Sequence, residues 1–258
     1  MTIPVLGLEV PPIDHLINWP SFLFDDTPFA INKVVLIYFF ATIVTILFFF
    51  MASRRAALVP RGMQNLAEAS IDFIREGVIL QTIGPDGMRF LPFLLAMFFF
   101  IFFSNITEVI PFIQFPANAR MAVPMFLALL VWFIYNIVGI AKQGPLHYLK
   151  NSLIPPGVPW PLLFLVVPIE FVSTFLVRPF SLAVRLFANM LAGHLILVTF
   201  AVICAALFSK TLLVVILPFS FGLLVGLTGF EVLVAVLQAF IFTILAAVYI
   251  GGSMHPEH

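Results

Sequence analysis

Residues 181–194, SLAVRLFANMLAGH, indicate the fold class of this chain. The stretch is a mostly apolar helical run, and it contains one arginine. Leu182, Leu186 and Met190 suit a hydrocarbon environment, whereas Arg185 does not. An arginine at the centre of a bilayer costs at least about 2.5 kcal/mol, so it needs a counter-charge or a wet cavity. The stretch therefore predicts a membrane helix that carries a functional charge.

The composition places the whole chain in a lipid bilayer. Of its 258 residues, 62% are hydrophobic and 9% are charged, and the mean hydropathy is +1.17, whereas a soluble domain has roughly 25% charged residues. The apolar runs are too long and too uniform for the alternating strands of a membrane β-barrel. We therefore expect an all-α integral membrane protein.

The charge balance and cysteine content argue against several other functions. Twelve basic and twelve acidic residues give a net charge of zero, so no nucleic-acid partner is expected. The single cysteine, Cys204, lies in an apolar run and excludes a disulfide framework and a cysteine-ligated metal site. We find no phosphate-binding loop and no cluster of metal ligands, so we expect neither an autonomous enzyme nor a bound metal or cofactor.

Charged residues between the apolar runs set the expected topology. Residues 1–30 contain acids but no Lys or Arg, and no cleavable signal sequence is expected there. Arg54 and Arg61 follow the first run, and Lys142 and Lys150 follow the third. Because cytoplasmic segments are rich in Lys and Arg, we expect 1–30 to be an extracytoplasmic N-terminal segment and the C-terminus to be cytoplasmic.

Residues 63–80 are too polar to cross a membrane. Their apolar side chains nevertheless recur at helical spacing opposite the acids, at Leu66, Phe73, Ile74 and Val78. This pattern predicts an amphipathic helix that lies on the cytoplasmic membrane surface. An ordinary solvated helix is the alternative.

We expect about five membrane-crossing helices in a single membrane domain, 1–258. Three are of ordinary length, and two, 162–208 and 211–254, contain 47 and 44 residues. As helices these two would be about 65–70 Å long, roughly twice the hydrocarbon thickness. Either each breaks into smaller pieces, or the two form one steeply tilted antiparallel hairpin, and length alone does not decide. The three ordinary spans are about 34–52, 90–110 and 121–141.

A hairpin folded near residue 211 would bring rare polar side chains together. The residue numbers of His194 and Glu231 sum to 425, and those of Arg185 and Gln238 sum to 423, so each pair lies at one height. Asn189 follows Arg185 by one turn on the same face. Intramembrane ionisable residues usually face a water-filled path, although buried polar groups can also simply satisfy one another. His194 and Glu231 can exchange protons, whereas Arg185 does not deprotonate and is a fixed positive charge.

Two further features lie on the same long stretch. Glu170 and Arg178 could line a second wet region nearer the cytoplasm, or they form an ordinary pair at the water interface. Ala188 and Ala192 lie near the face of Arg185 and allow another helix to approach closely. Because no carboxylate of this chain is expected opposite Arg185, its partner is expected on another chain.

The segments FSLAVRLFANMLAGHLI (180–196) and VLQAFIFTILAAVYI (236–250) resemble subunit a of the F-type ATP synthase membrane sector. The resemblance places the family's essential arginine on Arg185, an asparagine on Asn189 and a glutamine of the partner helix on Gln238. The interacting Glu/His pair of the family is present as His194 and Glu231, in the reverse order from the best-known bacterial form.

The resemblance implies a non-catalytic, proton-conducting stator subunit, present in one copy in a hetero-oligomeric complex of a bacterial plasma membrane. Its expected partners are a rotating c-subunit ring, whose carboxylates meet Arg185, and b-type peripheral stalk subunits. One half-channel would lead to the cytoplasm near Glu170. The other would enter from outside past His194, Glu231, Asn189 and Gln238.

An ion-coupled secondary transporter, with His194 and Glu231 as its coupling site, is the main alternative. Transporters commonly contain internal repeats and paired broken segments, and we find neither in the sequence. A purely structural membrane scaffold is the second alternative, and it gives no reason for Arg185.

Overall fold

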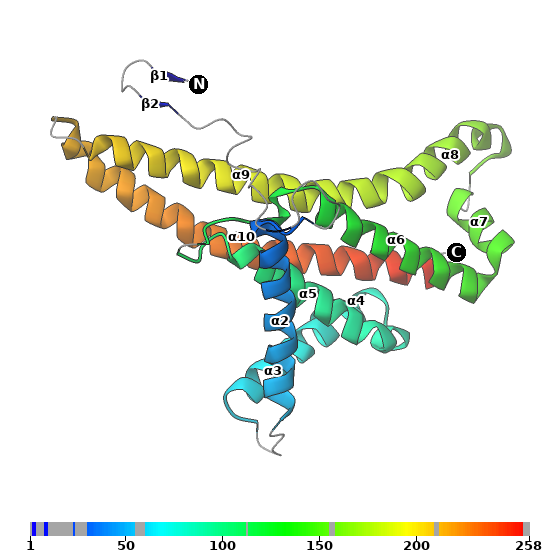
Figure 1. Ribbon diagram of the computed structural model, residues 1–258. Coiled ribbons are helices and arrows are strands. Elements are labelled where there is room, and N and C mark those ends of the chain that lie inside the picture. Colours follow the sequence, from blue (N-terminus) through cyan, green and yellow to red (C-terminus); the bar gives the residue numbers. More distant parts are fainter. Residues whose placement is uncertain are drawn as a thin grey trace. The chain divides into compact units, whose positions relative to one another are not determined.

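The computed structural model describes residues 2–3, 8–9, 23, 30–54, 60–111, 113–154, 158–208 and 212–254. Most of the predicted N-terminal segment 1–30, and the predicted turn at Ser209 and Lys210, therefore lie outside the described residues. The described part of the chain is almost entirely helical (Figure 1).

The elements follow one another with short connections. Two short strands near the N-terminus pair antiparallel, with Thr2 opposite Glu9, and Leu23 and Ile31 form an isolated bridge. In chain order the elements are β1 (Thr2–Ile3), β2 (Leu8–Glu9), α2 (Lys33–Ser53), α3 (Met63–Ile74), η1 (Arg75–Ile79), α4 (Leu80–Thr82), η2 (Pro85–Phe90), α5 (Leu91–Ile106), η3 (Ala117–Ala119), α6 (Ala122–Gln143), α7 (Pro145–Leu153), α8 (Trp160–Val172), η4 (Ser173–Val177), α9 (Arg178–Leu207), η5 (Leu212–Ile216) and α10 (Leu217–Met254).

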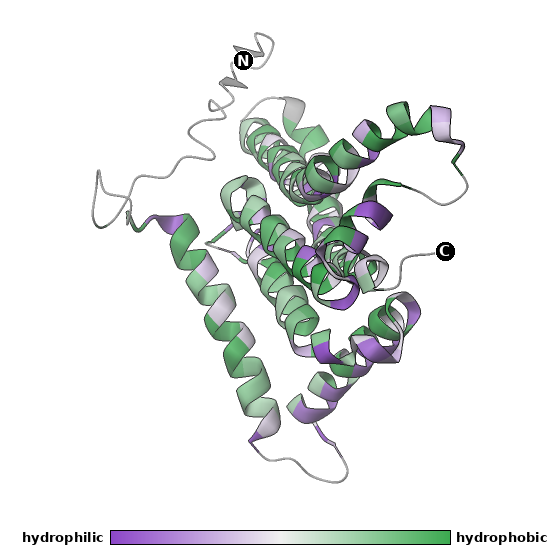
Figure 2. Cartoon of the chain, turned by 90° about the vertical axis from the view of Figure 1, so that its right-hand side faces the viewer, coloured by the Kyte–Doolittle hydropathy of each residue, from purple (hydrophilic) through white to green (hydrophobic). Residues whose placement is uncertain are grey.

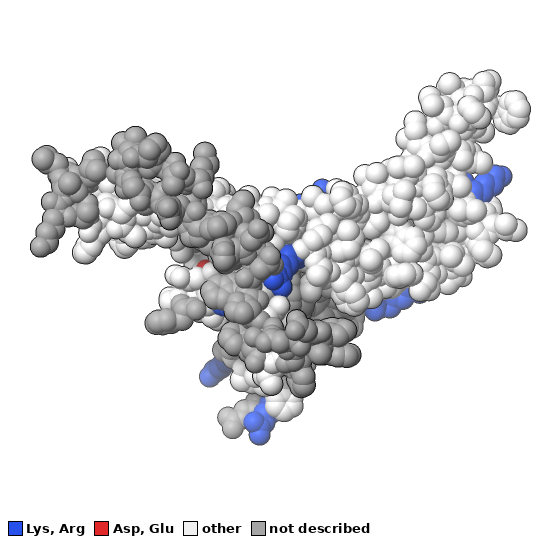
Figure 3. All heavy atoms as spheres, turned by 45° about the horizontal axis from the view of Figure 1, so that its top comes forward, with Lys and Arg blue, Asp and Glu red and all other residues white. Residues whose placement is uncertain are grey.

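Among the described residues, five helical segments are long and apolar enough to cross a membrane. Figure 2 shows hydrophobic colouring along most of their length. On the face in Figure 3, Lys and Arg are few and lie apart among uncharged side chains. These features confirm the predicted all-α membrane fold. The five segments are Lys33–Ser53, Pro85–Ile106, Ala122–Gln143, Trp160–Leu207 and Val214–Met254.

The two long apolar stretches do not break into short spans. Trp160–Leu207 runs for 48 residues, with a π-helical turn at Ser173–Val177, and Val214–Met254 runs for 41 residues. The alternative of several upright pieces is therefore wrong. Helices of about 60–70 Å must lie steeply tilted to stay within a bilayer. Residues 187–207 of α9 and 217–238 of α10 run antiparallel, side by side, as the predicted hairpin (Figure 1).

The second span ends earlier than the predicted limit of 110. Helix α5 stops at Ile106, and a turn follows. The hydroxyl of Thr107 lies within hydrogen-bond distance of two carbonyl oxygens, those of Ser104 at 2.8 Å and Phe115 at 3.0 Å. Because Thr107 bonds to the returning chain, residues 107–110 belong to the loop and not to the helix.

Contacts group the chain into two compact units, each built from segments that are distant in sequence. Unit 1 comprises Met1–Val44, Phe100–Arg120 and Phe187–Gln238. Unit 2 comprises Thr45–Phe99, Met121–Leu186 and Ala239–His258. The single membrane domain stays a prediction.

In unit 1 the first turns of α2 pack against the loop that follows α5. Val34 and Ile37 of α2 form a buried apolar cluster with Phe115 and Ala117 of the loop. The loop is therefore held by apolar contact as well as by the hydrogen bonds of Thr107.

In unit 2, α6 contacts several other elements. The hydroxyl of Tyr135 donates to the carbonyl oxygen of Thr174 in the π-helical turn at 2.8 Å, and the amide of Gln143 donates to the carbonyl oxygen of Ser253 at 2.8 Å. Tyr148 of α7 packs onto α6 at Gly139, where a Cβ atom would overlap its ring. Burial raises the pKa of the Tyr148 hydroxyl, so the group stays protonated and donates to Asn136 at 3.1 Å.

The predicted amphipathic segment is helical from Met63 to Thr82, and purple, hydrophilic residues are frequent along α3 (Figure 2). Ile74 and Val78 are fully buried, as the pattern predicts, but Leu66 is 55% exposed. Phe73 is partly exposed, although its ring lies 5.4 Å from that of Phe240. The helix is thus amphipathic, with a narrower buried face than predicted. Its cytoplasmic position stays a prediction.

Candidate functional site

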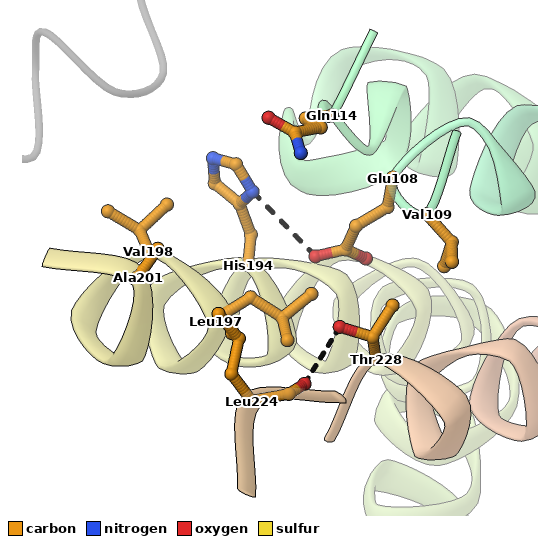
Figure 4. A pocket seen from close by; sticks show the side chains of 9 residues that line it. All are labelled: Glu108, Val109, Gln114, His194, Leu197, Val198, Ala201, Leu224 and Thr228. Atoms are coloured by element: carbon orange, nitrogen blue, oxygen red, sulfur yellow. Dashed lines mark hydrogen bonds and ion pairs between the residues drawn. The ribbon is translucent and has the colours of Figure 1, made fainter. Parts of the chain in front are cut away.

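A buried contact between a histidine and a carboxyl group joins the hairpin to the loop that follows α5. In unit 1 the Nδ1 atom of His194 lies 3.7 Å from the Oε1 atom of Glu108. The two side chains are only 8% and 2% exposed. Burying a carboxylate is costly unless it is paired, so this contact is the strongest functional feature of the unit. Figure 4 shows the two side chains pointing toward each other.

Glu231 of α10 lies at the same height on the hairpin. Its carboxylate faces the backbone of Gly193, so close that a Cβ atom there would come within 2.5 Å of it. The numbers of Gly193 and Glu231 sum to 424, which confirms the predicted register for this part of the hairpin. Glu231 is buried, and the residue that it faces, Gly193, is next to His194 in α9. The structure therefore gathers three ionisable groups, Glu108, His194 and Glu231, inside unit 1.

Two carboxylate oxygens of this cluster are not satisfied by hydrogen bonds. Glu108 Oε1 and Glu231 Oε2 are buried and have no hydrogen-bond partner among the described residues. Buried polar atoms of this kind normally bond to protein or to ordered water. Water is the expected partner, because the cluster borders a cavity.

The cavity holds about 190 Å³ and lies between the hairpin and the loop (Figure 4). A water molecule needs about 30 Å³ in the liquid, so several fit. Polar side chains and apolar side chains both line it. The lining residues are Glu108, Val109, Gln114, His194, Leu197, Val198, Ala201, Leu224 and Thr228.

An aromatic ring holds His194 from a second side. Phe115 lies edge-on to the imidazole, with ring centres 5.5 Å apart. The amine of Lys33 lies 5.9 Å from the centre of the same phenyl ring. The loop thus supplies two neighbours of His194, the carboxylate of Glu108 and the ring of Phe115.

Arg185 lies on the surface of the chain and not in its interior. Arg185, Ala188, Asn189 and Ala192 are all exposed along one face of α9. The described residues give Arg185 no ion-pair partner. A charged residue flanked by two alanines leaves room for another helix to approach it closely.

The remaining predicted site residues lie elsewhere. Glu170 is partly exposed on α8, and Arg178, predicted near it, lies over the ring of Tyr249 at 5.6 Å. Gln238 is buried on α10. Its predicted pairing with Arg185 stays a prediction, because the two residues belong to different units. No group of three or more potential metal ligands occurs among the described residues.

Comparison with known proteins identifies the family. The family model for the ATP synthase A chain matches residues 35–251. The chain belongs to the ATP synthase A chain family. It is 43% identical over 248 residues to ATP synthase subunit a of Rhodococcus erythropolis, covering 92% of this chain and 88% of that protein. It is 44% identical over 235 residues to the subunit a of Frankia alni, covering 88% and 79%, and 37% identical over 245 residues to that of Streptomyces lividans, covering 92% and 87%.

Membership of the ATP synthase A chain family makes this chain a multi-pass membrane protein and favours the ATP synthase interpretation over the secondary transporter. The matched range includes the whole cluster in unit 1 and the exposed face of α9. The sequence alone predicted Arg185, His194 and Glu231 but missed Glu108. One signal could have found it: an acid directly after the apolar run 90–107, with no basic residue near it in the sequence.

Proposed function

We propose that this chain is the proton-conducting subunit a of an ATP synthase membrane sector and provides two offset half-channels beside a rotating ring. The observation that carries the proposal is the cavity lined by the buried pair of His194 and Glu108. Titratable groups beside a water-sized cavity inside a membrane helix hairpin form the start of a proton path.

The inlet half-channel begins at this cavity. A proton from the extracytoplasmic side reaches Glu108 and His194, and then Glu231. The Glu231 carboxylate faces Gly193, which directly precedes His194 in the chain. From there the proton passes Asn189 and Gln238 to a carboxylate of the ring. The reversed order of the Glu/His pair is compatible with this path, because the Glu231 carboxylate faces Gly193, the residue next to His194.

Arg185 acts at the ring and not within this chain. Its exposed position on α9, and the absence of an ion-pair partner among the described residues, support a carboxylate partner on the c-subunit ring. An arginine stays charged when buried, so it stabilises the ionised ring carboxylate between the half-channels and blocks direct leakage. A passage across about 100–150 mV supplies about 2.3–3.5 kcal/mol per proton, which a leak would dissipate.

The release half-channel leads to the cytoplasm near Glu170. This assignment follows the topology expected from Lys142 and Lys150, with the N-terminus outside and the C-terminus inside a bacterial plasma membrane. One copy of the chain would act with the ring and with b-type stalk subunits, and the nucleotide chemistry would occur on other subunits.

The deciding experiment replaces Arg185 in the assembled complex. Arg185→Ala should reduce ATP-driven acidification of inverted membrane vesicles to background while the ring still copurifies. Arg75→Ala is the matched control, because Arg75 is an exposed arginine whose ion pair with Asp72, at 3.9 Å, lies on the amphipathic helix. Wild-type acidification by Arg185→Ala would overturn the proposal.

A further inference from the structure

Asn118 lies at the centre of a buried hydrogen-bond network in unit 1. It is fully buried in η3, and its side chain makes three hydrogen bonds to two other elements. Its amide donates to Ser104 Oγ at 2.8 Å and to Asn105 Oδ1 at 2.7 Å, while its carbonyl oxygen accepts from the hydroxyl of Tyr38 at 3.1 Å.

We propose that Asn118 is a positioning residue that holds Glu108 against His194. The proposal rests on the proposed function, because it assigns Asn118 to the inlet of the proton path. Asn118 is not one of the residues that line the cavity, and it acts through the end of α5 and the loop.

The first step leads from Asn118 to Glu108. Ser104 and Asn105 form the last turn of α5, and the backbone N–H of Glu108 donates to the carbonyl oxygen of Asn105 at 3.1 Å. The turn that carries Glu108 therefore starts from the residue that Asn118 fixes. If the Asn105 side chain moves, the origin of this turn moves with it.

The second step leads from Asn118 to Phe115. Thr107 binds both Ser104 and Phe115 through its hydroxyl, and Phe115 lies edge-on to His194. Ser104 thus accepts from two residues: its carbonyl oxygen from the Thr107 hydroxyl and its Oγ from the Asn118 amide. Asn118 and Thr107 together fix the loop to the end of α5. The two neighbours of His194, Glu108 and Phe115, therefore keep a fixed position relative to each other.

The third step extends the network to the first span. Tyr38 of α2 donates to Asn118, and its ring stacks on Phe100 of α5 with centres 5.8 Å apart. Helix α2 contributes no group to the cavity lining. Its contribution to the inlet is to anchor the residue that positions the loop.

The geometry is tested by cross-linking inside the assembled complex. Glu108→Cys and His194→Cys are combined in a Cys204→Ala background, and a short thiol-reactive cross-linker joins them. We expect Asn118→Ala to lower the cross-link yield by about fivefold, the size of a typical coupling between neighbouring groups. Asn136→Ala is the matched control. Asn136 is also a buried asparagine that accepts from a tyrosine hydroxyl at 3.1 Å, but it belongs to unit 2, and its replacement should leave the yield unchanged.

Proton pumping tests the same link through activity. Asn118→Ala should lower ATP-driven pumping in the native background but have little further effect in a Glu108→Gln background, because it acts through Glu108. If Asn118→Ala complexes fail to assemble, Tyr38→Phe removes one hydroxyl with little change of shape, and Tyr148→Phe is its control. Tyr38→Phe should then lower the cross-link yield, and Tyr148→Phe should not.

The outcomes separate the two proposals. Wild-type pumping by Glu108→Gln would overturn the proposed inlet. A cross-link yield that responds no more to the variants of Asn118 and Tyr38 than to their controls, while Glu108→Gln pumps measurably but more slowly than wild type, would overturn this inference alone. If Asn118→Ala lowers pumping by the same factor in the native and the Glu108→Gln backgrounds, the inference is also overturned. Equal factors would mean that Asn118 acts independently of Glu108, for example through general stability.

Discussion

The carboxylate of Glu231 lies directly against the backbone of α9 at Gly193, where a Cβ atom would come within 2.5 Å of Oε1 and 2.6 Å of Oε2. The hairpin therefore leaves no free space for a side chain at the residue next to His194. The backbone of α9 has ordinary helical geometry there, so an added side chain would be opposed by the Glu231 carboxylate, which would have to move.

Gly193→Ala should impair proton pumping and destabilise the hairpin. The added methyl group displaces the Glu231 carboxylate or separates the helices, at a cost of about 1–3 kcal/mol typical of overpacking. Thermal stability and pumping of the purified complex are the measurements. Gly226→Ala on α10 is the control, since nothing lies within 4 Å of its added Cβ. Equal behaviour of the two variants would contradict the close approach at Gly193.

The exposed face of α9 should become covered when the complex assembles. Ala188→Cys, in a Cys204→Ala background, should react with a membrane-permeant maleimide in the isolated chain and be protected in the complex, because the proposed contact with the ring would cover this face. Ala183→Cys serves as the buried control, since Ala183 is fully buried within the chain. Unchanged labelling of Ala188→Cys on assembly would place the ring elsewhere.

The sequence predicted the membrane-spanning helices and the alignment of Glu231 with the residues around His194 because few polar residues occur in the apolar stretches. Each polar residue, such as His194 or Glu231, limits the alignments in which it can face another polar group on the partner helix. The contact of Glu231 with Gly193 agrees with the alignment predicted in this way. The early end of α5 was not predicted, because it depends on Thr107 bonding to Phe115, a contact that hydropathy does not encode.

Glu108 escaped prediction for a related reason. Its partner, His194, is distant in sequence and is brought to it by a loop, not by helix periodicity. The buried face of α3 was also only partly predicted, because Leu66 is 55% exposed whereas Ile74 is fully buried. Helical spacing defines which residues share a face, but tertiary packing decides how much of the face is buried.

Close packing between α6 and α7 predicts a stability effect that is separate from proton transport. Gly139→Ala should destabilise the chain by about 1–3 kcal/mol, because the new methyl group would overlap the ring of Tyr148. Tyr148→Ala should restore part of the loss in the double variant, by removing the ring. Gly252→Ala, with open space around its Cβ, is the control. Thermal unfolding in detergent measures all four, and a double variant that shows the sum of both losses would contradict the contact.

Glu108, His194 and Glu231 should behave as one unit in proton transport. His194→Glu would gather three carboxylates that repel one another, and Glu231→His would leave two imidazoles beside Glu108, so each change should lower pumping by about tenfold or more. Exchanging both residues restores two carboxylates and one imidazole at the three positions. The exchange variant should therefore pump faster than the more damaged single variant.

Acidification of inverted vesicles, driven by ATP, measures both single variants and the exchange. Glu108→Gln provides the further comparison: it removes the carboxylate that pairs with His194 at 3.7 Å, so the exchange should no longer rescue pumping in that background. Losses that simply multiply across the three positions would mean that the residues act independently. The inlet would then have to lie outside the cavity between the hairpin and the loop.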